Sequence, residues 1–214
     1  MRRVRVREHV NPLGIQYQQP TPPPDWTRIY GDWKLPLSLD IGCGRGEYLL
    51  QMAQRHGDRN FLGLEIREPL VQSANTARDI LGLPNLHYLF CNVNPTLPGL
   101  LPPRSIHQVT IQFPDPWFKR RQQKRRTVQP ELVATLAQLL IPGGEVRLQS
   151  DVKPVAIAMI RCFDADGRFL NLAGSGQFAP DDLYPQHIPT ERERWTLHNG
   201  SPIYRGYFNR RLDA

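Results

Sequence analysis

The segment from Phe113 to Lys119, FPDPWFK, holds the residues best suited to chemistry. Two prolines fix the backbone on either side of Asp115, so the carboxylate of Asp115 is held in one place. Trp117 follows, and its ring can stack on a ligand or pack against the protein. This sequence is typical of neither a strand nor a helix, so regular secondary structure does not explain it. We predict a binding or catalytic loop; the alternative is a proline-rich loop whose aspartate caps the next helix.

A dense run of positive charge follows this loop. Six cations fall within the eight residues from Lys119 to Arg126, and they supply six of the seven net positive charges of the chain. A charge run is usually a solvated face, but this one adjoins a predicted ligand-binding loop and can neutralise several phosphates at once. Its position favours RNA as the partner.

A glycine-rich turn is the second candidate site. The sequence LDIGCGRGE, from Leu39 to Glu47, is typical of a strand that runs into a turn and then a helix. Gly42, Gly44 and Gly46 let the backbone approach a ligand closely, and Asp40 stands two residues before the first of them. The GxGxG spacing is shorter by one residue than the GxGxxG of dinucleotide-binding folds. We therefore predict a cofactor loop of another kind.

Two polar residues mark the ends of the next two predicted strands. Glu65 ends one strand, where a carboxylate can accept hydrogen bonds from both ribose hydroxyls of a nucleoside. Asn92 follows the other. Alone, either residue is more simply a solvated strand end or a turn residue. Their spacing after the glycine loop favours a shared ligand site.

The elements that must position these residues follow an alternating pattern. Apolar runs of four to eight residues alternate with helical patterns, which indicates a parallel sheet covered by helices. Two further strands are expected near the end of the chain. Because ligands bind at the carboxyl ends of the strands in such a doubly wound α/β fold, the candidate residues should meet there. The expected strands are Leu37 to Ile41, Phe61 to Glu65, Leu86 to Phe90, Ile106 to Phe113, Glu145 to Gln149, Phe169 to Leu172 and Ile203 to Arg211.

Apolar periodicity and prolines place the helices between the strands. Pro130 fits the first turn of one helix, which we expect Gly143 and Gly144 to end, and Pro154 can open another that runs through Phe163. The apolar faces are Leu49, Met52 and Ala53; Leu70, Ala74, Ala77 and Leu81; and Leu132, Leu136, Leu139 and Leu140.

Length and composition indicate one globular domain. A chain of 214 residues with 40% hydrophobic residues can build one sizeable core. Three widely separated cysteines predict neither a disulfide framework nor a zinc site. Without an apolar stretch of signal-peptide or membrane-span length, we predict a cytoplasmic chain with no membrane or metal partner. Residues 1–35, basic and then proline-rich, predict an extended arm or a segment draped over the core, and residues 36–214 the domain itself.

Several separated motifs, in order, resemble those of the bacterial tRNA (guanine-N(7)-)-methyltransferase family. The resemblance covers nearly everything from His9 onward. It implies the class I methyltransferase fold, a Rossmann-like, mostly parallel seven-stranded sheet with a terminal antiparallel strand, and transfer of a methyl group from S-adenosyl-L-methionine to the variable-loop guanosine at tRNA position 46. The matching pieces are HVNPLG at His9 to Gly14, LDIGCGRGEY, FLGLEIR, FPDPWFK with RQQKRR behind it, LQSD ending at Asp151, and PTERE at Pro189 to Glu193.

The resemblance also implies roles for single residues. Asp115 matches the residue that the family treats as catalytic. With it, the cofactor site is lined by Asp40, Gly42, Gly44, Gly46, Glu65 and Asn92, with Asn92 near the adenine amino group. The positions that match substrate contacts are Lys119, Asp151, Thr190 and Glu193, and those that match the RNA-binding stretch are Arg121, Lys124, Arg125 and Arg126.

Simpler interpretations stand beside these roles. Lys119 fits a solvated lysine, Asp151 a strand end or helix cap, and the TxxE spacing of Thr190 and Glu193 a capping box. The chain also departs from the family, which often has Glu at position 40, Asp at position 92 and His at position 122. Asn92 keeps an acceptor oxygen but loses the charge, so this departure bears most directly on the cofactor contact.

Three other functions remain open from the sequence. The first is a methyltransferase of the same fold that acts on another base, RNA or small molecule, because a fold does not choose its substrate. The second is a noncatalytic tRNA-binding protein. The third is a nicotinamide-dependent dehydrogenase, against which the GxGxG spacing counts. The oligomeric state is predicted only as monomer or homodimer.

Overall fold

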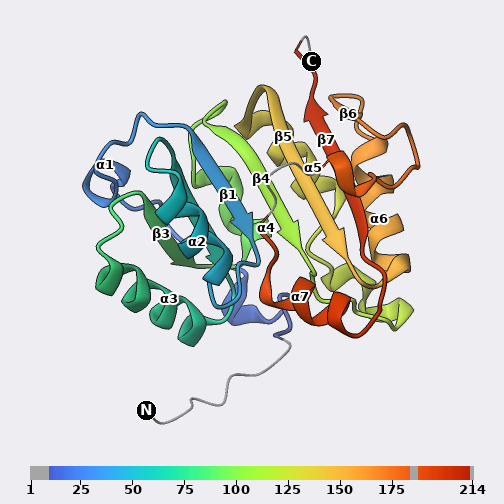
Figure 1. Ribbon diagram of the computed structural model, residues 1–214, viewed down its shortest axis with the longest axis horizontal. Helices are drawn as coiled ribbons and strands as arrows, with labels where there is room; N and C mark the ends of the chain where they lie inside the picture. Colours follow the sequence, from blue (N-terminus) through green and yellow to red (C-terminus); the bar gives the residue numbers. More distant parts are fainter. Residues whose placement is uncertain (1–9, 184–187, 213–214) are drawn as a thin grey trace.

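The computed structural model describes residues 10–183 and 188–212. Its seven strands form one twisted sheet in the order β3-β2-β1-β4-β5-β7-β6 (Figure 1). Neighbours from β3 to β5 are parallel, whereas β7 runs antiparallel to both β5 and β6. The predicted fold is confirmed. The strands are β1 Leu37–Ile41, β2 Asn60–Glu65, β3 Leu86–Phe90, β4 Ile106–Gln112, β5 Leu140–Ser150, β6 Phe169–Asn171 and β7 Tyr204–Arg210.

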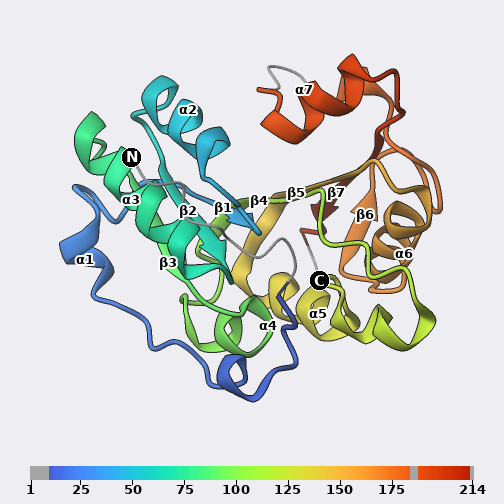
Figure 2. The same ribbon diagram turned by 90° about the horizontal axis from the view of Figure 1, so that it is seen from below.

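Helices cover both faces of the sheet. Helices α2 and α7 lie on one face, and α4, α5 and α6 lie on the other, as the view along the sheet shows (Figure 2). The α-helices are α1 Trp26–Ile29, α2 Glu47–Arg55, α3 Glu68–Leu81, α4 Val93–Thr96, α5 Pro130–Leu139, α6 Lys153–Asp164 and α7 Glu191–His198. The 3-10 helices are η1 Ile15–Tyr17, η2 Leu97–Gly99, η3 Arg120–Arg125 and η4 Asp181–Leu183.

The sheet separates two apolar cores. The smaller core joins α2 and α3 to β2 and β3, and its largest fully buried side chains are Phe61 and Tyr88. The larger core joins α5 and α6 to the central strands. Because the strands are buried on both faces, their residues form continuous apolar runs in the sequence. These runs made the strand positions predictable.

Two local expectations were wrong. Leu81 is 46% exposed, because it occupies the last turn of α3, whereas Val71 nearer the middle of the helix is buried. Gly143 and Gly144 do not end the helix that starts at Pro130. That helix ends at Leu139, because Leu140 already pairs with Ile106 of β4 and begins the strand that runs through both glycines.

The early part of the chain packs on the core. Trp26 and Tyr30 are buried among the side chains of the larger core, and Trp33 stacks on both of their rings. The indole of Trp26 donates to the Leu100 carbonyl, and the hydroxyl of Tyr30 donates to the Phe61 carbonyl. Residues 26–33 are therefore packed against the sheet domain.

Within residues 10–183 and 188–212, no helix has the length and apolar character needed to cross a bilayer. The same part of the chain contains no cluster of three or more His, Cys, Asp or Glu side chains that could hold a metal ion.

Candidate active site

Two adjoining cavities open at the carboxyl ends of the parallel strands. A narrow pocket of about 110 Å³ lies over β1, β2 and β3, and a wider cavity of about 670 Å³ extends from the glycine loop to the start of α7. Most of the predicted site residues line one or the other. The residues that line both are Gly42, Arg67, Gln112, Phe113, Pro114 and Asp115.

The loop that carries Asp115 is strained and braced. Phe113 and Trp117 have φ angles of 49° and 42°, a region that side-chain-bearing residues rarely adopt. The guanidinium of Arg126 donates to the carbonyl of Pro116 at 2.9 Å, and that of Arg125 lies over the Trp117 ring, 5.0 Å from its centroid. The loop therefore holds Asp115 where it lines both cavities.

The basic run divides into two faces. Residues three apart lie above one another in a 3-10 helix, and η3 follows this rule. Arg121 and Lys124 share an exposed face, whereas Gln122 and Arg125 share a half-buried one. Arg126, beyond η3, is also half-buried. Of the four predicted RNA-binding cations, two face solvent and two hold the Asp115 loop.

The glycine loop leaves room for a ligand. Gly42, Gly44 and Gly46 have φ angles of 80°, 58° and 76°, which explains why glycine stands at each position. A Cβ at Gly42 would meet no protein atom within 4 Å, so the space beside it is open. At Gly46, by contrast, a Cβ would lie 2.6 Å from the ring of Tyr88. Gly46 therefore serves packing at the start of α2 as well as lining the wider cavity.

Glu65 is a buried carboxylate, not a solvated strand end. Its side chain is 3% exposed and accepts hydrogen bonds from the backbone amides of Gly44 and Arg67, each at 3.0 Å. The Arg67 guanidinium donates to both carboxylate oxygens, at 2.9 and 3.0 Å. Ribose hydroxyls that bind to Glu65 would compete with this guanidinium. Sequence reasoning gave Arg67 no role of its own, although it ends the FLGLEIR motif and stands two residues after Glu65.

Asp40 lies below the glycine loop, at the floor of the wider cavity. It accepts from the hydroxyl of Thr110 at 2.6 Å and from the amide of Gln112 at 3.4 Å. Burial raises the pKa of Asp40 to about 6, against the lowering effect of these two hydrogen bonds, and the neighbouring Glu65 carboxylate raises it further. Asp40 therefore titrates near neutral pH.

Asn92 connects the narrow pocket to the start of the described chain. Its amide nitrogen donates to the carbonyl of Pro12 at 3.0 Å and to the carbonyl of Tyr17 at 3.1 Å. Both amide hydrogens are therefore used, and only the oxygen can serve an adenine amino group. Val10 and Pro12 complete this wall of the pocket.

The predicted substrate contacts lie around the wider cavity. Asp151 and Thr190 line it, and Asp151 pairs with Arg192 of α7 at 2.5 Å. Lys119 is exposed beside the loop. Thr190 and Glu193 form the complete capping box that their spacing indicated. This structural role is present whether or not they also bind substrate.

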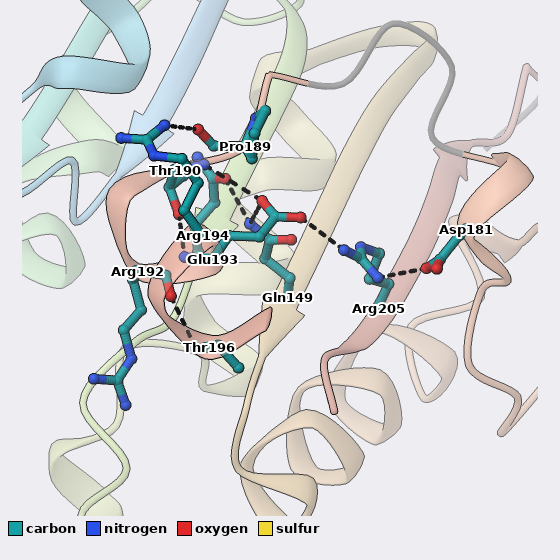
Figure 3. A network of polar contacts seen from close by, with 10 residues as sticks. Gln149, Asp181, Pro189, Thr190, Arg192, Glu193, Arg194, Thr196 and Arg205 are labelled. Atoms are coloured by element: carbon teal, nitrogen blue, oxygen red, sulfur yellow. Dashed lines mark hydrogen bonds and ion pairs between the residues drawn. The ribbon is translucent and has the colours of Figure 1, made fainter. Parts of the chain in front are cut away.

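Glu193 is the centre of a buried polar network. It is 1% exposed, and its carboxylate pairs with Arg205 of β7 at 2.7 Å and accepts from Gln149 of β5 at 3.2 Å (Figure 3). Arg205 also pairs with Asp181. Neither Gln149 nor Arg205 was predicted as a site residue, because nothing local in the sequence marks partners so far apart.

The residues present fit S-adenosyl-L-methionine. Open space beside Gly42 adjoins a buried carboxylate at Glu65 and the amide oxygen of Asn92, in a pocket that continues to Asp115. These are the groups needed for a backbone approach, a ribose and an adenine amino group.

Two solved methyltransferases share this fold. Geranyl diphosphate C-methyltransferase from Streptomyces coelicolor A3(2) matches 87% of the chain and 75% of its own with a TM-score of 0.53 at 12% identity. A SAM-dependent methyltransferase from Aquifex aeolicus matches 83% and 84% with a TM-score of 0.53 at 14% identity. At these identities the likeness establishes the fold, which is that of a class I methyltransferase.

Sequence comparison narrows the class to one family. A family model described as "Putative methyltransferase" matches residues 34–206. The tRNA (guanine-N(7)-)-methyltransferase of Synechococcus sp. (strain JA-3-3Ab) is 56% identical over 97% of this chain and 86% of its own. That of Thermosynechococcus vestitus (strain NIES-2133 / IAM M-273 / BP-1) is 54% identical over 97% and 95%. The chain belongs to the tRNA (guanine-N(7)-)-methyltransferase family.

Proposed function

We propose that this protein transfers a methyl group from S-adenosyl-L-methionine to N7 of a guanosine in tRNA, and that the target is the variable-loop guanosine at position 46. Family membership supports the reaction. The observation that carries the proposal is the position of Asp115, which lines both the narrow pocket and the wider cavity. A carboxylate there lies between a cofactor and a base.

The proposed roles of the cofactor-site residues follow from their hydrogen-bonding capacity. When bound, S-adenosyl-L-methionine supplies an electrophilic methyl group on a positively charged sulfur. Glu65 binds the ribose, Asn92 accepts from the adenine amino group through its oxygen, and Asp40 offers a negative charge at the floor of the wider cavity. The backbone of Gly42 and Gly44 allows close approach.

The proposed role of Asp115 is electrostatic. N7 of guanine is an acceptor with a free lone pair, so no proton needs to be removed before it attacks a methyl group. The purine becomes more positive as the methyl arrives, and a fixed carboxylate stabilises that charge and orients the base. The braced loop holds Asp115 without further reorganisation.

The proposed substrate side combines the cavity rim with the basic run. Thr190 and Asp151 line the cavity and contact the base, and Glu193, which is buried, acts by holding Thr190. Lys119, Arg121 and Lys124 are exposed and bind phosphates. Arg125 and Arg126 contribute mainly by supporting the loop.

Further parts of the proposal concern the whole chain. We infer a cytoplasmic protein, with residues 1–35 as an N-terminal arm, of which Val10 and Pro12 line the narrow pocket and residues 1–9 lie outside the described residues, and with residues 36–214 as the catalytic domain. The oligomeric state, monomer or homodimer, is to be decided by light scattering coupled to size-exclusion chromatography.

One experiment tests the reaction and its target. The protein is incubated with labelled S-adenosyl-L-methionine and an unmodified tRNA transcript, and the digested RNA is analysed for 7-methylguanosine. We expect label in 7-methylguanosine, and none in a matched transcript with adenosine at position 46. Binding of tRNA without methylation would favour the noncatalytic alternative, and another modified nucleoside would favour a different base specificity.

A further inference from the structure

A continuous series of hydrogen bonds runs across the sheet at the carboxyl ends of its parallel strands. Arg205 donates to Glu193, and Gln149 donates to Glu193 at 3.2 Å and to the side-chain oxygen of Gln112 at 2.8 Å. Gln112 in turn donates to Asp40 at 3.4 Å. The series thus links α7, at the rim of the wider cavity, to the acid below the glycine loop. Figure 3 shows its outer half, with Glu193 between Gln149 and Arg205.

Strand register explains why these side chains meet. Gln149 of β5 lies opposite Gln112 of β4 on one side and opposite Arg205 of β7 on the other. Asp40 of β1 lies opposite Thr110, which is two residues before Gln112 on β4. Because side chains alternate along a strand, Thr110 and Gln112 point to the same face of the sheet. That face is the one that α7 covers (Figure 2).

The two carboxylates, Glu193 and Asp40, fix the orientation of the amide groups of Gln149 and Gln112 between them. The Glu193 carboxylate, paired with Arg205, accepts hydrogen bonds only, so the NH2 group of Gln149 must face it. Ionised Asp40 likewise accepts only, so the NH2 group of Gln112 must face it. Both conditions are met only when the oxygen of Gln112 receives the second hydrogen of Gln149, as the structure has it.

This arrangement has a cost in stability. The side-chain oxygen of Gln149 is buried and has no hydrogen-bond partner within the described part of the chain. Turning the amide round would aim that oxygen at the Glu193 carboxylate. A buried acceptor without a partner is unfavourable, and it needs an explanation.

We propose that Gln112 and Gln149 are positioning residues. They hold the start of α7, at the rim of the wider cavity, in a fixed position relative to Asp40 below the glycine loop. The inference rests on the proposed function, since it assigns the start of α7 to the bound base and Asp40 to the bound cofactor. Thr190, at the start of α7, and Asp40 both line the wider cavity. The two amides therefore set the distance between a bound base and a bound cofactor, to which methyl transfer is sensitive.

The central test replaces Gln149 by leucine, which keeps the volume and removes both donated hydrogen bonds. We expect Gln149→Leu to lower kcat by about 10-fold or more, because small misplacements can cost about 100-fold in rate. Dissociation constants for tRNA and for S-adenosyl-L-homocysteine should stay within about twofold, since the exposed cations and the narrow pocket are unchanged.

Gln108→Leu is the matched control. Gln108 also joins β4 to β5, by donating to Glu145 at 3.0 Å, but it lies near the other end of the strand pair. A loss of sheet stability alone should affect Tm and kcat in the same way in both variants. A fall in kcat confined to Gln149→Leu supports the positioning role, and wild-type kcat in Gln149→Leu overturns it. Absence of 7-methylguanosine with the wild-type protein would instead refute the proposed function.

Gln112→Glu tests the inner half of the series and keeps the inference falsifiable should Gln149→Leu not fold. In this variant the carboxylate at position 112 can accept a hydrogen bond from Gln149 but cannot donate one to Asp40. It also adds a negative charge beside Asp40. The pKa of Asp40 should rise, so tight binding of S-adenosyl-L-homocysteine should begin at a higher pH than in the wild-type protein. An unchanged pH profile would overturn the link. The titratable groups around Asp40 are Glu65, Cys43, Tyr48 and Tyr88, which the variant leaves in place.

Discussion

Helices α2 and α7 lie on the same face of the sheet but are attached to it in different ways. Helix α2 buries Tyr48, Leu49 and Ala53, an apolar stripe that packs in the smaller core. Helix α7 buries only Glu193 and Thr196 among its residues, and both are polar. Apolar packing is nondirectional, whereas hydrogen bonds and ion pairs fix angles. Helix α2 is therefore attached to the sheet by apolar packing, and helix α7 by directed polar contacts.

The largest expected effect comes from removing the charge that holds α7. Glu193→Ala removes the buried partner of Arg205, and breaking a buried ion pair costs about 3–5 kcal/mol; we expect the lower part of this range, because Arg205 still pairs with Asp181. We expect faster hydrogen exchange in the amides of α7, while those of α2 keep their protection. Equal loss of protection in both helices would mean that they unfold together, and the contrast between them would fail.

Asp115→Ala should lower kcat by about 100- to 1,000-fold, the range found when one electrostatic stabiliser is removed from an active site. Binding of tRNA, measured by filter retention, should be nearly unchanged, because the exposed cations remain. Near-normal turnover in this variant would refute the catalytic role. Asp58→Ala is a suitable control, since Asp58 is an exposed acid on the loop between α2 and β2.

The two faces of the basic run should respond differently to substitution. Replacing Arg121 and Lys124 together should weaken tRNA binding and reduce its salt dependence by about one unit of slope for each phosphate that is no longer neutralised. Replacing Arg125 and Arg126 should mainly lower kcat, because these side chains hold the Asp115 loop. Identical binding isotherms and salt slopes for the two double variants would contradict this division.

The smallest effect concerns pH. The pKa of Asp40 is about 6 in the folded protein, against 3.8 for an unperturbed aspartate, so protonation favours the folded state between these values. The stability of the ligand-free protein should therefore lose a contribution from Asp40 as the pH rises through about 6. Affinity for S-adenosyl-L-homocysteine should rise over the same interval as Asp40 ionises. Calorimetric titrations of the wild-type protein and Asp40→Asn between about pH 5 and 8 check this, and equal pH dependence in both would contradict it.

The sequence was informative where structure depends on neighbours along the chain. Buried strands such as Leu37–Ile41 and the positive-φ glycines after it follow from local patterns. The capping box at Thr190 was visible from its spacing. The contacts of Gln149 and Arg205 were not, because they depend on which strands become neighbours in the folded sheet. The basic run is visible in the sequence, but only the 3-10 geometry of η3 separates Arg121 from Arg125.

The double hydrogen bond from Asn92 to Pro12 and Tyr17 has a consequence for how this protein can change over evolutionary time. The amide of Asn92 donates to two carbonyl oxygens at once, whereas a carboxylate at position 92 has no hydrogen to donate and would repel both. An aspartate cannot simply be introduced here, because it would lose both hydrogen bonds to residues 12 and 17 beside the narrow pocket. We therefore expect residue 92 and residues 12–17 to covary among related sequences, because a change at position 92 alters the hydrogen bonds that hold this segment.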